Sequence, residues 1–138
     1  MIREFSAGGV VLRRMQGREF VAVVRVRDEI LALPKGHPDG DESAALAAER
    51  EVREETGVEA ELVEKLGDIK YWYARDGDRV MKIVSFFLFR YRSGKLADHD
   101  HEVEEALWIP LEEAPERLAY KSEKEIAQAA LSRLVPGS

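Results

Sequence analysis

The chain has 138 residues, of which 45% are hydrophobic and 35% are charged, and it contains no cysteine. This length predicts a single domain over residues 1–138, and the hydrophobic content is sufficient for a folded core. The net charge of −6 argues against binding to polymeric DNA or RNA, because sequence-independent binding needs a basic surface that displaces counterions. The absence of cysteine excludes disulfides, thiolate metal sites and cysteine nucleophiles.

The sequence also lacks membrane signals. The opening residues MIREFSAGG have no apolar segment of the kind found in signal peptides, and no stretch reaches the length of a membrane span. These features favour a cytoplasmic protein that does not bind membranes.

Two apolar segments, residues 5–14 (FSAGGVVLRR) and residues 19–27 (EFVAVVRVR), predict two strands joined by a hairpin at residues 15–18. Gly8 and Gly9 interrupt the first segment and leave nothing to pack at their positions. We therefore expect a ligand or another backbone to come close to the first strand at these glycines.

A short apolar segment, residues 30–33, leads into the loop PKGHP at residues 34–38. The two prolines make this loop stiff, and it delivers Lys35 and His37 to the start of an acidic segment. These cations lie beside the acidic segment, where they are available to a phosphate group. Lys35 is the stronger candidate, because a loop histidine is often only a surface residue.

The acidic segment GHPDGDESAALAAEREVREETGV, residues 36–58, predicts a helix of about three and a half turns. Three residues with side-chain oxygens are candidate N-caps: Asp39, Asp41 and Ser43. The helix should begin near Ala44, and Gly57 suits the left-handed position that ends a helix.

Three glutamates on this helix, Glu51, Glu54 and Glu55, stand at i, i+3 and i+4, so their carboxylates project from one face. Like charges at this spacing oppose a helix by roughly 0.2–0.5 kcal/mol per pair, and Arg50 can pair with Glu54 without neutralising all three. Hard divalent cations bind carboxylate oxygens, and magnesium usually keeps one or two of them while substrate phosphates complete its coordination. The alternative is a solvated acidic face laced with Arg50 and Arg53.

Residues 62–73 and 79–91 predict a long antiparallel strand pair joined at an Asp-Gly turn. Tyr71 and Tyr73 should share one face, with the intervening tryptophan on the other, so the tyrosines either stack a base or pack in the core. Lys82 lies among apolar residues of the partner strand. It is either an edge residue or a phosphate contact.

The C-terminal part carries weaker signals. His99 and His101 have the spacing of a zinc pair, but H-x-H without further partners is a weak zinc signal. Residues 111–119 predict a short helix, and Ser122 with Glu125 predicts a capping box that starts the last helix. That helix should dock on the sheet through one apolar face: Ile126, Ala130, Leu131 and Leu134.

The spacing from Gly36 through Glu42 to the segment REVREETGV, residues 50–58, resembles the Nudix box, and every fixed position of that motif is filled. The resemblance implies a hydrolase of nucleoside diphosphates linked to another moiety, with Mg²⁺ as cofactor and Mn²⁺ as an alternative. It also implies an α/β/α sandwich with a mixed central sheet, which the order of predicted strands and helices supports.

The resemblance assigns the metal-ligand role to the box glutamates: Glu51, Glu54 and Glu55. It assigns a supporting role to two residues: Glu42 and Arg50. A backbone carbonyl of Lys35 or Gly36 is expected to reach the metal. Glu102, just before the strand ending in Trp-Ile-Pro, takes the place of a further metal ligand or of the general base, with Glu104 and Glu105 as the nearest rivals for this position. Glu54 is the other candidate for the base, and the sequence does not separate the two.

A narrower resemblance, to the diadenosine tetraphosphate hydrolases of the bacterial and animal type, rests on short motifs: FSAGGV at residues 5–10, PKG at 34–36, YWY at 71–73, Lys82, and Tyr120-Lys121. It implies asymmetric cleavage of diadenosine tetraphosphate to ATP and AMP. Lys35 and Lys82 would contact phosphates, and tyrosines would lie near adenine: Tyr71, Tyr73 and Tyr120. The sequence departs from many of these relatives at Gly40-Asp41, where they have Pro-Gly.

Other functions remain open on the sequence alone. The first is hydrolysis of oxidised nucleoside triphosphates such as 8-oxo-dGTP, with the same box and a different base pocket. A pyrophosphohydrolase of diphosphoinositol polyphosphates would need more basic residues near the site. A nucleotide-sensing module without catalysis is an alternative of another class. The expected partner is a small nucleotide, and the chain is expected to be a monomer or a homodimer.

Overall fold

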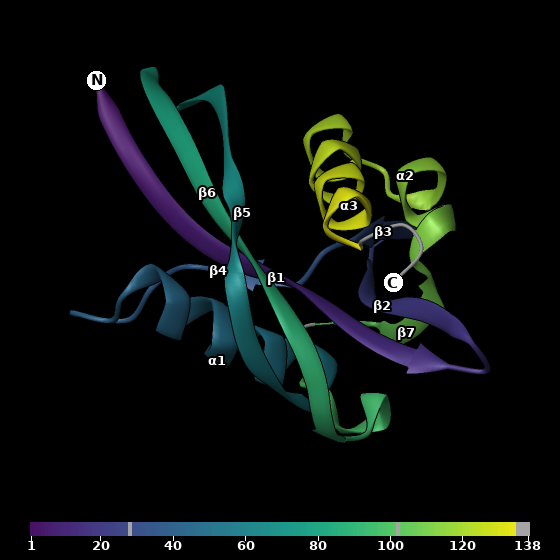
Figure 1. Ribbon diagram of the computed structural model, residues 1–138. Helices are drawn as coiled ribbons and strands as arrows, with labels where there is room; N and C mark the ends of the chain where they lie inside the picture. Colours follow the sequence, from purple (N-terminus) through teal and green to yellow (C-terminus); the bar gives the residue numbers. More distant parts are fainter. Residues whose placement is uncertain (28, 102, 135–138) are drawn as a thin grey trace.

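The structure is a computed structural model that describes residues 1–27, 29–101 and 103–134 (Figure 1). Its strands are β1 (Ile2–Met15), β2 (Arg18–Val26), β3 (Ile30–Ala32), β4 (Lys35–Gly36), β5 (Val58–Arg75), β6 (Asp78–Gly94) and β7 (Glu105–Pro110). Its α-helices are α1 (Ala44–Thr56), α2 (Ala114–Arg117) and α3 (Lys121–Arg133), and two short 3₁₀ helices are η1 (Leu96–Asp98) and η2 (Leu111–Glu113). No helix in these described ranges is both long and apolar enough to cross a membrane.

The seven strands form one mixed sheet. Its main order is β3-β2-β1-β6-β5, with β4 paired to β1 and β7 paired to β2. The pairing of β1 with β6 is parallel, whereas the other pairs are antiparallel. Helix α1 covers one face of the sheet, and α2 and α3 lie on the other (Figure 1). The predicted sandwich with a mixed central sheet is therefore confirmed.

Two tight turns close the long hairpins. Gln16 and Gly17 have φ angles of 52° and 77°, and Asp76 and Gly77 have φ angles of 52° and 83°. Positive φ at both central residues is the signature of two-residue turns whose twist matches that of the strands they join. Both predicted hairpins are confirmed by this turn chemistry.

Strand β5 is longer than the sequence predicts, because it begins at Val58, directly after the glycine that ends α1. Its register against β6 shifts between Glu59 and Ala60, between Leu62 and Glu64, and between Lys65 and Gly67. Each bulge breaks the two-residue alternation by which a strand is recognised. The first part of β5 was therefore not recognisable as a strand from the sequence.

Helix α1 has the predicted limits. The Ser43 hydroxyl accepts a hydrogen bond from the Leu46 N–H at 3.2 Å, which selects Ser43 among the candidate caps. At the other end Gly57 has φ +81°, and its N–H donates to the Arg53 carbonyl at 2.9 Å. The buried side of the helix, which includes Val52, packs against the sheet.

The capping box predicted for α3 is wrong. The helix begins at Lys121, with Tyr120 at the N-cap and no side-chain cap hydrogen bond, so Ser122 lies inside the first turn. The predicted apolar face does dock on the sheet, since Ile126 and Ala130 are buried in its core. Residues 111–119 form η2 and α2, in agreement with the predicted short helix.

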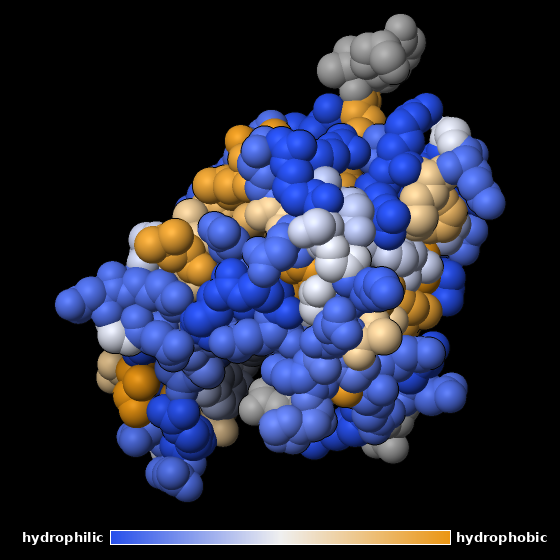
Figure 2. Space-filling view, turned by 90° about the horizontal axis from the view of Figure 1, so that it is seen from below, coloured by the Kyte–Doolittle hydropathy of each residue, from blue (hydrophilic) through white to orange (hydrophobic). Residues whose placement is uncertain are grey.

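Hydrophilic residues cover most of the face seen in Figure 2, and apolar residues there form small separate patches. The protein surface also carries exposed ion pairs such as Arg18 with Glu113. Because an exposed pair contributes only about 0–1 kcal/mol, the fold depends mainly on the apolar layers between the sheet and its helices.

The two glycines of β1 lie where the backbone of the loop and helix α1 come closest. A Cβ atom at Gly8 would lie 2.5 Å from the Pro34 carbonyl oxygen, and one at Gly9 would lie 2.6 Å from Cγ2 of Val52. The Gly9 N–H also donates to the Pro34 carbonyl at 3.1 Å. The predicted close approach is confirmed, and the approaching group at Gly8 is the loop backbone.

We expect Gly8→Ala to lower the free energy of unfolding by about 1–3 kcal/mol, because the added methyl overpacks a rigid backbone contact. Chemical denaturation followed by circular dichroism measures this change. An unfolding midpoint equal to that of the unsubstituted chain would show that the loop moves away from β1 at no cost.

Candidate functional site

The three box glutamates form a ridge on α1 that faces β4; we call Glu51, Glu54 and Glu55 the acidic ridge. The Glu55 carboxylate accepts a hydrogen bond from the Lys35 N–H at 3.2 Å. The Glu51 carboxylate lies so close to Gly36 that a Cβ atom there would overlap it. Only glycine allows the β4 backbone to touch the ridge in this way.

The ridge is electrostatically unfavourable without a cation. Burial raises the pKa of Glu55 to about 7, and repulsion from Glu51 adds to this effect. Burial also raises the pKa of Glu51, with a contribution from Glu54. Within the described ranges no three acidic or histidine side chains form a preassembled metal site. The buried carboxylates and the neighbouring backbone of β4 nonetheless offer oxygen atoms of the kind that hard divalent cations bind. A bound cation would relieve the repulsion between the carboxylates.

Arg50 connects the ridge to the preceding loop. Its guanidinium donates to the Glu42 carboxylate at 3.0 Å, to the His37 carbonyl at 2.8 Å and to Glu54 at 3.1 Å. These bonds raise the pKa of Arg50 above its usual value and lower that of Glu42. Arg50 and Glu42 thus lie beside the ridge, and their supporting role stays a prediction. Glu54 keeps 45% of its side chain exposed.

The segment expected to supply a further acidic ligand is described only in part. Glu102 lies outside the described residues, so its role stays a prediction. The Asp100 N–H donates to the Glu54 carbonyl at 2.8 Å, and the Asp100 charge contributes to the raised pKa of Glu55. Sequence reasoning gave Asp100 no role of its own. Nδ1 of His99 lies 2.6 Å from the Asp100 carbonyl oxygen.

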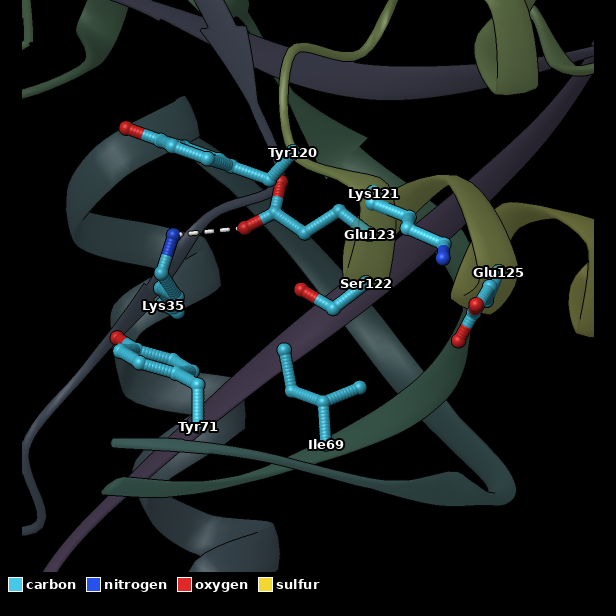
Figure 3. A pocket seen from close by; sticks show the side chains of 8 residues that line it. All are labelled: Lys35, Ile69, Tyr71, Tyr120, Lys121, Ser122, Glu123 and Glu125. Atoms are coloured by element: carbon cyan, nitrogen blue, oxygen red, sulfur yellow. Dashed lines mark hydrogen bonds and ion pairs between the residues drawn. The ribbon is translucent and has the colours of Figure 1, made fainter. Parts of the chain in front are cut away.

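A cavity of about 560 Å³ opens beside β4 (Figure 3). The rings of Tyr71 and Tyr120 stand on either side of Lys35, and Ile69 lies below them. Lys121 and Glu125 point away from Lys35. We call this cavity the aromatic pocket. Its size and ring-lined walls suit a nucleobase.

Lys35 joins the aromatic pocket to the acidic ridge. Its Nζ donates to the Glu123 carboxylate at 2.7 Å and lies 5.5 Å from the centroid of the Tyr120 ring. Its backbone N–H is bound to Glu55. Glu123 is a residue that sequence reasoning missed, because nothing near it in the sequence points to Lys35, 88 positions away.

Tyr73 and Lys82 belong to a second polar cluster next to the pocket. The Tyr73 hydroxyl donates to Glu4 at 2.7 Å, and Nζ of Lys82 lies 3.6 Å from Glu4 and 3.5 Å from Nε2 of His37. Lys82 is only 8% exposed and its strand β6 lies between β1 and β5, so the edge alternative is wrong. Burial lowers the pKa of Lys82. The Tyr71 and Tyr73 rings are 6.4 Å apart, which confirms that they share a face.

The described geometry thus brings most predicted site residues into one region. The acidic ridge meets β4, Lys35 leads to the aromatic pocket, and the Lys82 cluster adjoins the pocket through the tyrosine pair. This layout places carboxylates, a lysine and aromatic rings side by side.

Comparison with known proteins gives the class of this site. The NUDIX domain family model matches residues 3–130, so the chain belongs to the Nudix family. Nudix hydrolases generally use divalent metals such as Mg²⁺.

Two sequence relatives are mycobacterial. The chain is 41% identical over 136 residues to a Mycobacterium tuberculosis protein named as mutator protein MutT4, covering 94% of this chain and 55% of the relative. It is 30% identical over 117 residues to an 8-oxo-(d)GTP phosphatase of Mycolicibacterium smegmatis, covering 85% of this chain and 35% of the relative. The chain therefore spans about half of the first relative and about a third of the second.

Among solved structures, the Ap4A hydrolase of Caenorhabditis elegans superposes with a TM-score of 0.73 at 20% identity. The match covers 95% of this chain and 97% of that one. At this level of identity the likeness establishes the shared fold.

We expect the metal-free protein to lose stability as the pH rises from about 4.5 to about 7, because Glu55 releases its proton near pH 4.5 in the unfolded chain and near pH 7 in the folded one. The folded state binds the extra proton in this window, so stability is highest on its acidic side. Glu55→Gln should remove up to about 3 kcal/mol of this loss, since each pKa unit corresponds to about 1.4 kcal/mol.

The measurement is the free energy of unfolding in chelator at several pH values. Glu116→Gln, an exposed carboxylate on α2, serves as the charge-matched control. A constant difference between Glu55→Gln and the unsubstituted chain across this window would contradict the raised pKa of Glu55.

Proposed function

We propose that this chain is a divalent-metal-dependent pyrophosphohydrolase that cleaves a phosphoanhydride bond in a nucleoside polyphosphate. The observation that carries the proposal is the contact of Lys35 with both parts of the site: its backbone N–H binds the acidic ridge and its side chain lines the aromatic pocket. A phosphate chain on the ridge would therefore lie next to a base in the pocket.

The residues that would hold Mg²⁺ are the acidic ridge and the backbone carbonyl of Lys35 or Gly36. A bound cation of this kind would lower the pKa of a water molecule that it binds, and it would neutralise charge on the phosphate oxygens. Arg50 keeps the loop and the ridge together through its bonds to Glu42 and the His37 carbonyl. This arrangement fixes the ridge before substrate binds, so little reorganisation is needed.

The chain must also accept a proton from the attacking water. In this proposal a carboxylate oxygen of Glu54 takes that proton, because its side chain is 45% exposed, against 13% for Glu51, and is oriented by Arg50 at 3.1 Å. Glu102 remains the alternative predicted from the sequence.

The aromatic pocket would bind the base. Tyr71 and Tyr120 offer ring faces, and the ammonium of Lys35 lies between them (Figure 3). A single base in this pocket, with its triphosphate on the ridge, favours a nucleoside triphosphate as substrate. The two mycobacterial relatives, one of them named as an 8-oxo-(d)GTP phosphatase, support hydrolysis of oxidised nucleotides.

A second candidate is asymmetric cleavage of diadenosine tetraphosphate. The observation that favours it is a second aromatic ring next to the aromatic pocket: the ring centroid of Tyr73 lies 6.4 Å from that of Tyr71. Lys82 lies near Tyr73, since both contact Glu4. These residues lie beyond the aromatic pocket and offer a ring face to a second nucleoside. The candidate thus depends on residues outside the Nudix box.

A substrate panel tests the proposal: 8-oxo-dGTP, dGTP, diadenosine tetraphosphate, ADP-ribose and a diphosphoinositol polyphosphate, each with Mg²⁺ or Mn²⁺ and with product identification. Release of pyrophosphate and a nucleoside monophosphate from a triphosphate supports the first candidate. ATP and AMP from diadenosine tetraphosphate support the second. Binding of nucleotides without cleavage of any of them would overturn the hydrolase and favour a sensing module.

Glu51→Gln should lower kcat by about 100-fold or more, because it removes a carboxylate that would hold the cation. Steady-state kinetics over a range of Mg²⁺ concentrations measure this loss. Glu59→Gln, an exposed carboxylate on β5, is the matched control and should retain activity. Full turnover by Glu51→Gln at low Mg²⁺ would contradict the assignment of the ridge.

Tyr71→Ala should raise the KM for the nucleotide by roughly 5-fold or more, since stacking of a base on an aromatic ring is worth about 1–3 kcal/mol. Trp72→Ala is the matched control, because Trp72 lies next in sequence and packs with Arg79, 4.4 Å from its ring centroid. Tyr73→Ala separates the candidates, as it should raise the KM for diadenosine tetraphosphate alone. Equal effects of Tyr71→Ala and Trp72→Ala would place the base elsewhere.

A further inference from the structure

Glu123 is a buried carboxylate in the first turn of α3. The residue is 1% exposed, yet it belongs to no part of the Nudix box. Oε1 accepts a hydrogen bond from the Leu33 N–H at 2.8 Å, and Oε2 accepts one from Nζ of Lys35 at 2.7 Å. Figure 3 shows the second bond crossing from α3 to β4. One side chain of the last helix thus holds two residues of the loop before α1.

The segment held by Glu123 leads directly into the acidic ridge. The Lys35 N–H binds Glu55, and Gly36 lies against Glu51. Leu33 is itself buried, so its N–H depends on the Glu123 carboxylate for a hydrogen-bond partner. Moving Glu123 would therefore move the backbone that contacts two of the ridge carboxylates.

Burial decides how Glu123 can act. Only 2% of its side chain is exposed, so a nucleotide in the aromatic pocket would meet Lys35 and the pocket tyrosines first. Both carboxylate oxygens are already engaged by Leu33 and Lys35. Glu123 thus works through these two residues and not by contact with the substrate.

We propose that Glu123 is a positioning residue, which fixes β4 against the acidic ridge and so sets the affinity of the ridge for a divalent cation. The proposal rests on the proposed function in so far as the ridge is taken as the metal site. It makes α3 part of the catalytic apparatus although α3 supplies no ridge residue. It also gives the aromatic pocket and the ridge a shared support, because the same ion pair holds the ammonium of Lys35 in the pocket wall.

The test is Glu123→Gln, which keeps an oxygen acceptor for the Leu33 N–H and removes the charge that holds Lys35. In metal-free protein we expect the backbone amide NMR signals of Lys35 and Gly36 to shift. We expect Mn²⁺ to bind about 10-fold more weakly without nucleotide, and kcat to fall by a larger factor than KM rises. Glu116→Gln, with the same charge change on the exposed side of α2, should leave the two amide signals and Mn²⁺ affinity unchanged.

A double variant guards against misfolding. If Glu123→Gln does not fold, Lys35→Met combined with Glu123→Gln removes both charges of the ion pair, so that neither the buried carboxylate nor the half-buried ammonium is left without its partner. It should fold and show the same weak Mn²⁺ binding. Unchanged Mn²⁺ affinity in a folded variant, even with a lower melting temperature, would overturn the proposal and leave Glu123 a structural residue.

The readouts separate this proposal from the proposed function. Weaker Mn²⁺ binding by Glu123→Gln, in a protein that hydrolyses no member of the substrate panel, would support the positioning role and overturn the hydrolase. Hydrolysis by the unsubstituted chain with unchanged Mn²⁺ affinity and kcat in Glu123→Gln would do the reverse.

Discussion

The site depends on one contact, between the backbone of β4 at Gly36 and the carboxylate of Glu51. A Cβ atom at position 36 would overlap the Glu51 carboxylate and displace it from this contact. A second glycine is needed on the other side of the loop, where Gly8 lets the loop backbone lie against β1. Gly8 lets β1 and the loop pack closely, and Gly36 lets β4 and α1 pack closely. As a result, carboxylates of α1 contact the backbone of β4 and not a side chain.

Local features of this site could be predicted from the sequence. The acidic ridge follows from the spacing of three glutamates on a helix, and the ends of that helix follow from Ser43 and Gly57. The structure confirms the helix limits because each depends on residues within a few positions of the helix end. The hairpin turns were predictable for the same reason.

Features that depend on distant residues could not be predicted. Glu123 is one of 27 acidic residues, and nothing near it in the sequence points to Lys35, 88 positions away. Lys82 was open to interpretation as an edge residue because the parallel pairing of β6 with β1 leaves no local pattern. The bulges of β5 had a similar effect, since each moves the apolar positions to the other face.

The parallel pairing of β1 with β6 also bears on how the chain reaches its native state. Residue 2 pairs with residue 80, so the first strand must wait for more than half of the polypeptide before it finds its neighbour. Closing so large a loop is entropically slow, which places such topologies among the slower folders. On the ribosome α1 would emerge after β1 but before β5 and β6, so part of its apolar side would stay uncovered until those strands are synthesised.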